Sequence, residues 1–223
     1  MTNQIDAIPF FPAVAPAACT EVTSAWALLA PVLEALADVV ETSAPLEAPT
    51  PCRSYSVGEL RDHVLGWLQY FAVALADPDR TGPRLEPDAY RAAQESRPLP
   101  DVVHDSAARI RTALDGGVLQ RRVVMSQAQM DGAAVVSMAL GEYVVHGWDL
   151  ATATGRPWQP SSQACQASLE FFAGTVAPEY RSEDGAGGMF GPEVEVSPDA
   201  SPLQRLLGFA GRDPRWAPPA AQA

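Results

Sequence analysis

The stretch Glu142-Tyr-Val-Val-His146-Gly-Trp-Asp149 decides the fold, because it places an acid and a base inside an otherwise apolar helix. The helical pattern spans about residues 131–154 and ends where Gly155 and Pro157 follow. From residue 132 to residue 147, Glu142 and His146 are the only acidic or basic side chains. They are four residues apart, so they share one face of the helix, and Asp149 falls on that face one turn later.

A charged pair on an apolar helix face needs compensation, because an unpaired buried charge is very costly. A mutual hydrogen bond would satisfy each residue, and a metal ion would satisfy both. His63 flanks the apolar stripe of an earlier predicted helix and is the natural third ligand. We therefore predict a divalent metal site of His63, Glu142 and His146, in which Asp149 orients His146 by accepting a hydrogen bond. Two histidines and one glutamate leave coordination positions open, which is typical of a reactive site.

Simpler interpretations of these residues stay open. Glu142 and His146 at this spacing can form an ordinary ion pair, and His63 alone is more often a core-edge or surface histidine. His104 lies among polar neighbours and is predicted to be on the surface. Cys52 is predicted to be a small buried residue, and the tryptophans to serve packing.

The apolar periodicity predicts a mostly all-α protein. The expected helices cover about residues 20–42, 57–77, 99–114, 131–154, 161–176 and 202–210, with a short helical piece near 89–94 and an extended segment at 121–126. Pro31 predicts a kink or a later start in the first helix. Ser56 followed by Glu59 predicts a capping box for the second. This pattern indicates an up-down four-helix bundle with short extra helices and long Pro/Gly-rich loops. We expect an irregular segment at 1–18, one domain at 19–216 and a disordered tail at 217–223.

Composition argues against several classes of protein. The net charge of −12 repels phosphate backbones and anionic lipid, so we expect no nucleic-acid or membrane partner. The three cysteines are far apart and form no CxxC pair, which argues against a disulfide framework. No basic residue precedes Arg53, so a signal peptide is not expected and the predicted location is cytoplasmic. All 15 basic residues are Arg, which favours a high-GC bacterial genome.

The segment from Glu142 to Gly155 resembles the signature helix of the actinobacterial mycothiol-dependent maleylpyruvate isomerase N-terminal domain family, one of the DinB-like metal-binding bundles. Thr50-Pro-Cys52, with Glu59-Leu60 and His63 after it, is similar to the family's Thr-Pro-Cys turn and to the helix that supplies its first histidine. Residues 206–216 resemble its closing helix, so the likeness covers about residues 20–216. Two positions depart from the family pattern: Tyr55 stands where Trp is common, and Arg53 where Pro is usual. The chain also lacks room for the second domain of full maleylpyruvate isomerases.

By motif position, the resemblance puts the family's metal ligands on His63, Glu142 and His146. It implies one divalent ion, usually zinc and in some cases nickel or another metal, and mycothiol as a co-substrate. The implied function is a metal-dependent enzyme that uses a low-molecular-weight thiol for S-transfer, or for addition and isomerisation, on a small electrophilic substrate. Arg53 and Arg122 are the candidates for binding a substrate carboxylate. A thiol-independent metal enzyme of a specialised biosynthetic pathway and a non-catalytic metal- or ligand-binding bundle stay open as alternatives, as does the choice between monomer and homodimer.

Overall fold

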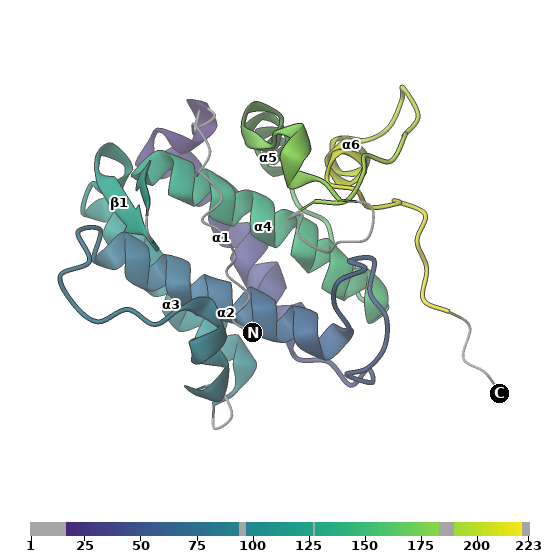
Figure 1. Ribbon diagram of the computed structural model, residues 1–223, viewed down its shortest axis with the longest axis horizontal. Coiled ribbons are helices and arrows are strands. Elements are labelled where there is room, and N and C mark those ends of the chain that lie inside the picture. Colours follow the sequence, from purple (N-terminus) through teal and green to yellow (C-terminus); the bar gives the residue numbers. More distant parts are fainter. Residues whose placement is uncertain (1–16, 94–96, 127, 183–189, 220–223) are drawn as a thin grey trace.

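Four long helices form a bundle in the structure, a computed structural model that describes residues 17–93, 97–126, 128–182 and 190–219. They are α1 (Val22–Val40), α2 (Val57–Ala76), α3 (Leu99–Asp115) and α4 (Gly132–Ala153), shown in Figure 1. Helices α1 and α2 each pack against both α3 and α4, so α1 lies diagonally opposite α2. The predicted mostly helical, DinB-like bundle is confirmed.

The shorter elements lie around this bundle. Helix α5 (Ser162–Thr175) packs on α4, and α6 (Pro202–Phe209) packs on α5. The short helical piece expected near residues 89–94 is a 3-10 helix, Pro87–Ala93; further 3-10 turns cover Ala17–Cys19, Val118–Gln120 and Pro178–Tyr180. The extended segment predicted at 121–126 is strand β1 (Arg122–Met125), and it pairs antiparallel with β2 (Ala128–Asp131), which the sequence pattern did not reveal. Most of the predicted irregular segment 1–18 and part of the tail 217–223 lie outside the described residues.

Helix α1 continues through Pro31 without interruption. Its length and apolar composition would suffice to cross a membrane. In the structure, however, its apolar stripe, with Leu29, Leu33 and Leu36 almost fully buried, belongs to the core that it forms with α3 and α4. Such burial is typical of a core helix.

The predicted capping box fixes the start of α2. The Ser56 backbone N–H donates to Glu59 Oε2 at 2.9 Å, and the Glu59 N–H donates to Ser56 Oγ at 3.4 Å. These contacts satisfy N–H groups that a helix start leaves free. Because the first residue of α2 is thereby set, His63 falls near the end of the second turn, facing α4.

Helix α4 is the central element, since it packs against α1, α2 and α5 and most of its side chains are buried. Two glycines allow close approach from α5 and from the segment before it. A Cβ on Gly141 would lie 2.5 Å from the ring of Phe172, and one on Gly147 would lie 2.1 Å from the ring of Trp158. The α4 backbone that carries the acid–base residues is therefore tightly packed against its neighbours.

Candidate metal centre

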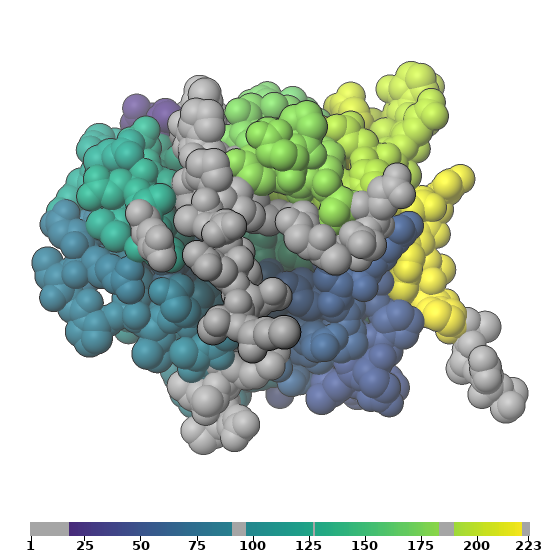
Figure 2. Space-filling view, viewed as in Figure 1, coloured from purple at the N-terminus to yellow at the C-terminus, as the bar shows by residue number. Residues whose placement is uncertain are grey.

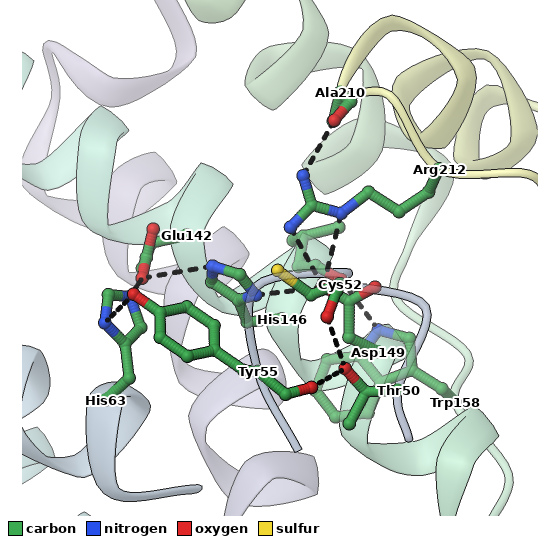
Figure 3. A network of polar contacts seen from close by, with 11 residues as sticks. Thr50, Cys52, Tyr55, His63, Glu142, His146, Asp149, Trp158, Ala210 and Arg212 are labelled. Atoms are coloured by element: carbon green, nitrogen blue, oxygen red, sulfur yellow. Dashed lines mark hydrogen bonds and ion pairs between the residues drawn. The ribbon is translucent and has the colours of Figure 1, made fainter. Parts of the chain in front are cut away.

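Three predicted ligand side chains, from two helices, converge on one point. His63 Nε2 of α2 lies 3.0 Å from Glu142 Oε1 of α4, and His146 Nε2 lies 3.6 Å from the same oxygen (Figure 3). Ligand atoms of all three residues lie within 4.8 Å of one another. The side chains of His63 and Glu142 are 22% and 23% exposed to solvent, so the cluster can be reached from outside the protein.

The hydrogen-bond pattern around His146 favours a cation in this cluster. His146 Nδ1 lies 2.9 Å from Asp149 Oδ2, and a carboxylate only accepts, so Nδ1 carries the proton of this bond. In a neutral imidazole, Nε2 then has a lone pair that faces the carboxylate oxygen of Glu142. Two acceptors facing each other need a proton or a metal ion between them. The donor set, two imidazole nitrogens and one carboxylate oxygen, suits zinc and other first-row dications.

Glu142 is held as a carboxylate. Burial would raise its pKa, but the charge of His146 and the hydrogen bond from His63 outweigh burial and lower the pKa to about 2. A ligand that is already deprotonated loses no proton when a metal binds. The site thus presents one anionic and two imidazole donors at neutral pH.

Tyr55 holds the far side of the His63 ring. Its hydroxyl lies 3.2 Å from His63 Nδ1, and the two ring centroids are 4.8 Å apart. Burial raises the pKa of Tyr55 to about 12, so the phenol stays protonated at neutral pH. The turn that carries Tyr55 is closed by Thr50, whose Oγ1 lies 2.9 Å from the Cys52 carbonyl oxygen and 2.8 Å from that of Tyr55.

Asp149 is fully buried and makes the contact with His146 that the helix spacing predicted. Its charge is balanced by Arg212, which is 7% exposed and donates to Asp149 Oδ2 from Nε at 3.3 Å and from Nη2 at 3.1 Å. Burial would raise the pKa of Asp149, but Arg212 and the hydrogen bond from His146 lower it. Sequence reasoning gave Arg212 no role. Two facts could have predicted this contact: a buried aspartate requires a positively charged partner, and Arg212 lies in the closing segment that resembles the family.

Cys52 forms a second possible donor group with His146 and Asp149. This group suits a cation poorly. Arg212 already donates to Asp149 Oδ2 from two nitrogens, and its positive charge beside this carboxylate would repel a second cation. We therefore take the cluster of His63, Glu142 and His146 as the candidate centre.

The other candidate residues lie apart from this cluster. Arg53 is exposed, and Arg122 pairs with Asp131 at 2.8 Å and donates to the Gln129 carbonyl on the hairpin. His104 is exposed on α3, 3.7 Å from Glu34 of α1. A surface hollow of about 470 Å³ between the end of α2 and α3 contains no candidate ligand. No structural contact joins either arginine to the centre among the described residues.

Comparisons with known proteins identify the family of this chain. Residues 25–151, more than half of the chain, match the mycothiol maleylpyruvate isomerase N-terminal domain family, and this range includes all three candidate ligands. Two uncharacterized proteins of Mycobacterium tuberculosis, from strains CDC 1551 / Oshkosh and H37Rv, are each 25% identical over 170 residues, which cover 76% of this chain and 86% of theirs. No solved structure matches significantly. The chain belongs to the mycothiol maleylpyruvate isomerase N-terminal domain family.

Proposed function

We propose that this protein is a cytoplasmic, divalent-metal-dependent enzyme that uses a low-molecular-weight thiol, mycothiol, on a small electrophilic substrate. The observation that carries the proposal is the convergence of His63 Nε2, His146 Nε2 and Glu142 Oε1 on one point that solvent can reach. Membership of a mycothiol-associated family supports the choice of thiol. Zinc is the proposed metal, and the enzyme acts as a transferase or isomerase.

The three ligand residues would hold the ion and leave further coordination positions open. A bound dication favours the deprotonated form of a thiol, and the thiolate is the reactive nucleophile. In the proposed reaction the thiol gives up its proton and its sulfur bonds to an electrophilic carbon of the substrate. In S-transfer the sulfur displaces a leaving group, which departs with the electrons of the broken bond and takes up the proton. In isomerisation the sulfur adds to a double bond, whose π electrons take up the proton; after rotation about the former double bond the carbon–sulfur bond breaks, the proton leaves, and the isomer and the thiol are released.

Residues around the ligands would orient them and shape the approach. Tyr55 supports His63 through its hydroxyl, and Asp149 supports His146. The Trp67 ring, 6.3 Å from that of His63 and half-buried, extends the aromatic surface beside the centre. Arg53 or Arg122 as a binder of substrate carboxylate stays a proposal, and it would require the substrate to extend to the surface of the bundle.

Elemental analysis tests the metal site first. We expect about one zinc or other divalent ion per chain in the parent and almost none in His63→Ala. His104→Ala is the matched control, because His104 is an exposed histidine outside the cluster. Equal metal content in parent and His63→Ala would refute the ligand assignment.

The thiol part needs its own measurement. Calorimetric titration with mycothiol should show binding to the metal-loaded parent and none to the metal-free protein. Consumption of the free thiol with a panel of electrophiles then tests turnover. Metal binding without thiol binding would leave a thiol-independent metal enzyme, and binding without turnover would leave a non-catalytic bundle.

A further inference from the structure

The hydrogen bonds of Asp149 connect a candidate metal ligand to the C-terminal segment. A single oxygen, Asp149 Oδ2, accepts from His146 Nδ1 and from two nitrogens of Arg212. Figure 3 shows the three side chains in sequence, with Arg212 entering from the side of the chain that follows α6. Arg212 lies 61 positions beyond residue 151, where the family match ends.

The backbone around Arg212 places the guanidinium in a defined position. Gly211 has φ +81°, a left-handed conformation that ends α6. The Arg212 N–H donates to the Leu207 carbonyl at 2.8 Å and the Gly211 N–H donates to the Gly208 carbonyl at 3.1 Å, which together form a Schellman motif. Arg212 Nη1 also donates to the Ala210 carbonyl at 2.7 Å. Hydrogen bonds therefore hold both the backbone of Arg212 and the guanidinium group at the end of its side chain.

The electrostatics explain why an arginine is needed there. Asp149 is fully buried, and a buried carboxylate without a counter-charge is strongly destabilising. His146 cannot supply this charge while it binds a metal, because a ligating imidazole is neutral. Arg212 is permanently charged and donates to Asp149 Oδ2 from two nitrogens, so it balances the carboxylate without a charge on His146.

We infer that Arg212 is a positioning residue of the metal centre, which acts through Asp149 to hold His146 with Nδ1 protonated and Nε2 free for the ion. The segment that follows α6 is thus part of the centre, although it lies outside the matched domain. This inference rests on the metal-binding part of the proposed function. In Figure 2 the yellow C-terminal residues appear beside the blue segment that leads into α2, and Figure 3 shows Cys52 of that segment next to Arg212.

A double-mutant cycle with Zn²⁺ as the probe tests the inference. Zinc affinity is measured by competition with a chromophoric chelator for the parent, Arg212→Met, Asp149→Asn and the double variant. We expect each single variant to lose about tenfold or more in affinity, as is usual when the partner of a ligating histidine is removed. We expect Arg212→Met to add little once Asp149 is Asn, because Arg212 acts only through the carboxylate. Losses that add in the double variant would overturn the inference.

Two further variants test whether zinc affinity depends on the position and donor geometry of Arg212 or only on positive charge in the C-terminal segment. Arg212→Lys, which keeps the charge without the fork of donors, should retain part of the affinity. Arg215→Met is the matched control, since Arg215 is 85% exposed, lies in the same segment and pairs only with Asp213 among the described residues. It should bind zinc like the parent, and a loss equal to that of Arg212→Met would overturn the inference.

A measurement on the metal-free protein covers the case in which Arg212→Met unfolds. The double variant, Arg212→Met with Asp149→Asn, carries no unpaired buried charge and should therefore fold. Its zinc affinity can then still be compared with that of Asp149→Asn alone. In Arg212→Lys, nitrogen NMR of His146 should show a changed Nδ1–H signal, and an unchanged signal together with parental zinc affinity would overturn the inference. A parent that binds no zinc would instead refute the proposed function itself.

Discussion

At the scale of single residues, each candidate histidine ligand has a different kind of partner. His63 Nδ1 lies against a neutral phenol, whereas His146 Nδ1 donates to a carboxylate that an arginine neutralises. A hydroxyl can donate or accept, so Tyr55 fits either tautomer of His63, while Asp149 accepts only the one with a proton on Nδ1. The His146 ring is therefore the more strongly oriented of the two.

Tyr55→Phe should weaken zinc binding while leaving the fold intact. The variant keeps the ring that packs on His63 but removes the hydroxyl that holds Nδ1. We expect about a tenfold loss of affinity, at the low end of the range for partners of ligating histidines. Chelator competition measures it, with Tyr90→Phe as the control outside the cluster. Parental affinity in Tyr55→Phe would show that the hydroxyl does not act on the site.

The lowered pKa of Glu142 predicts a pH dependence of stability in the metal-free protein. A carboxyl with a folded pKa of about 2 and an ordinary value of 4.5 stabilises the folded state above pH 4.5, and this contribution is lost as the pH falls toward 2. Compared with Glu142→Gln, the parent should lose roughly 3 kcal/mol of unfolding free energy over that range. Urea unfolding of both proteins between about pH 5 and pH 2 measures the difference. A difference that stays constant with pH would contradict the charge assignment.

Removal of His146 should affect both metal content and stability. His146→Ala leaves the partly exposed Glu142 and the buried Asp149 each without one of their partners. We expect loss of the metal and a destabilisation of about 1–3 kcal/mol. Elemental analysis and urea unfolding measure the two effects, and unchanged metal content would contradict the assignment of His146 as a ligand.

At the scale of elements, the close packing around α4 sets the position of the ligands. Gly147 follows His146 directly, and its missing side chain is replaced by the ring of Trp158, whose Nε1 donates to the Val144 carbonyl at 3.0 Å. An added methyl group must displace either this ring or α4. Geometry at the metal centre therefore depends on a contact made by the next residue of the helix, on another of its sides.

Gly147→Ala should destabilise the protein by about 2 kcal/mol or more, because overpacking a rigid core forces side chains and backbone to shift. It should also reduce zinc affinity, since His146 moves with the helix. Gly174→Ala is the matched control: it lies in helix α5 with open space around its Cβ position. That variant should gain up to about 1 kcal/mol from helix propensity. Thermal unfolding of both variants tests the contrast, and equal effects would refute it.

Much of this architecture was predictable from the sequence, because strong local signals specify it. The capping box at Ser56 and the periodic apolar residues gave the helices, and the four-residue spacing of Glu142 and His146 gave their common face. The hairpin partner β2 was missed, since its four residues, Ala128–Asp131, alternate between apolar and polar but include no β-branched or aromatic residue. The role of Arg212 was missed because its contact joins residues 63 positions apart, and spacing rules reach only within one element.

At the scale of the whole molecule, we expect the bundle to fold without the metal, so the contribution of the metal to stability can be measured on its own. The core of α1, α2, α3 and α4 is apolar, so we expect hydrophobic burial to hold the bundle together without the ion. Without a metal, Glu142 pairs with His63 and His146 pairs with Asp149, so the ligands retain partners. This arrangement differs from a closed structural zinc site, in which the metal supplies the folding free energy.

Chelation should therefore lower the melting temperature without unfolding the bundle. A metal that binds only the folded state adds about 2.7 kcal/mol when its free concentration is one hundred times its Kd, and a chelator removes this contribution. We expect the helical circular dichroism at 25 °C to be unchanged by the chelator, the melting temperature to fall, and added zinc to restore it. His63→Ala should melt at the same temperature with and without the chelator. Loss of helix on chelation would instead make the metal structural, and the open coordination positions that the proposed chemistry requires would then lose their support.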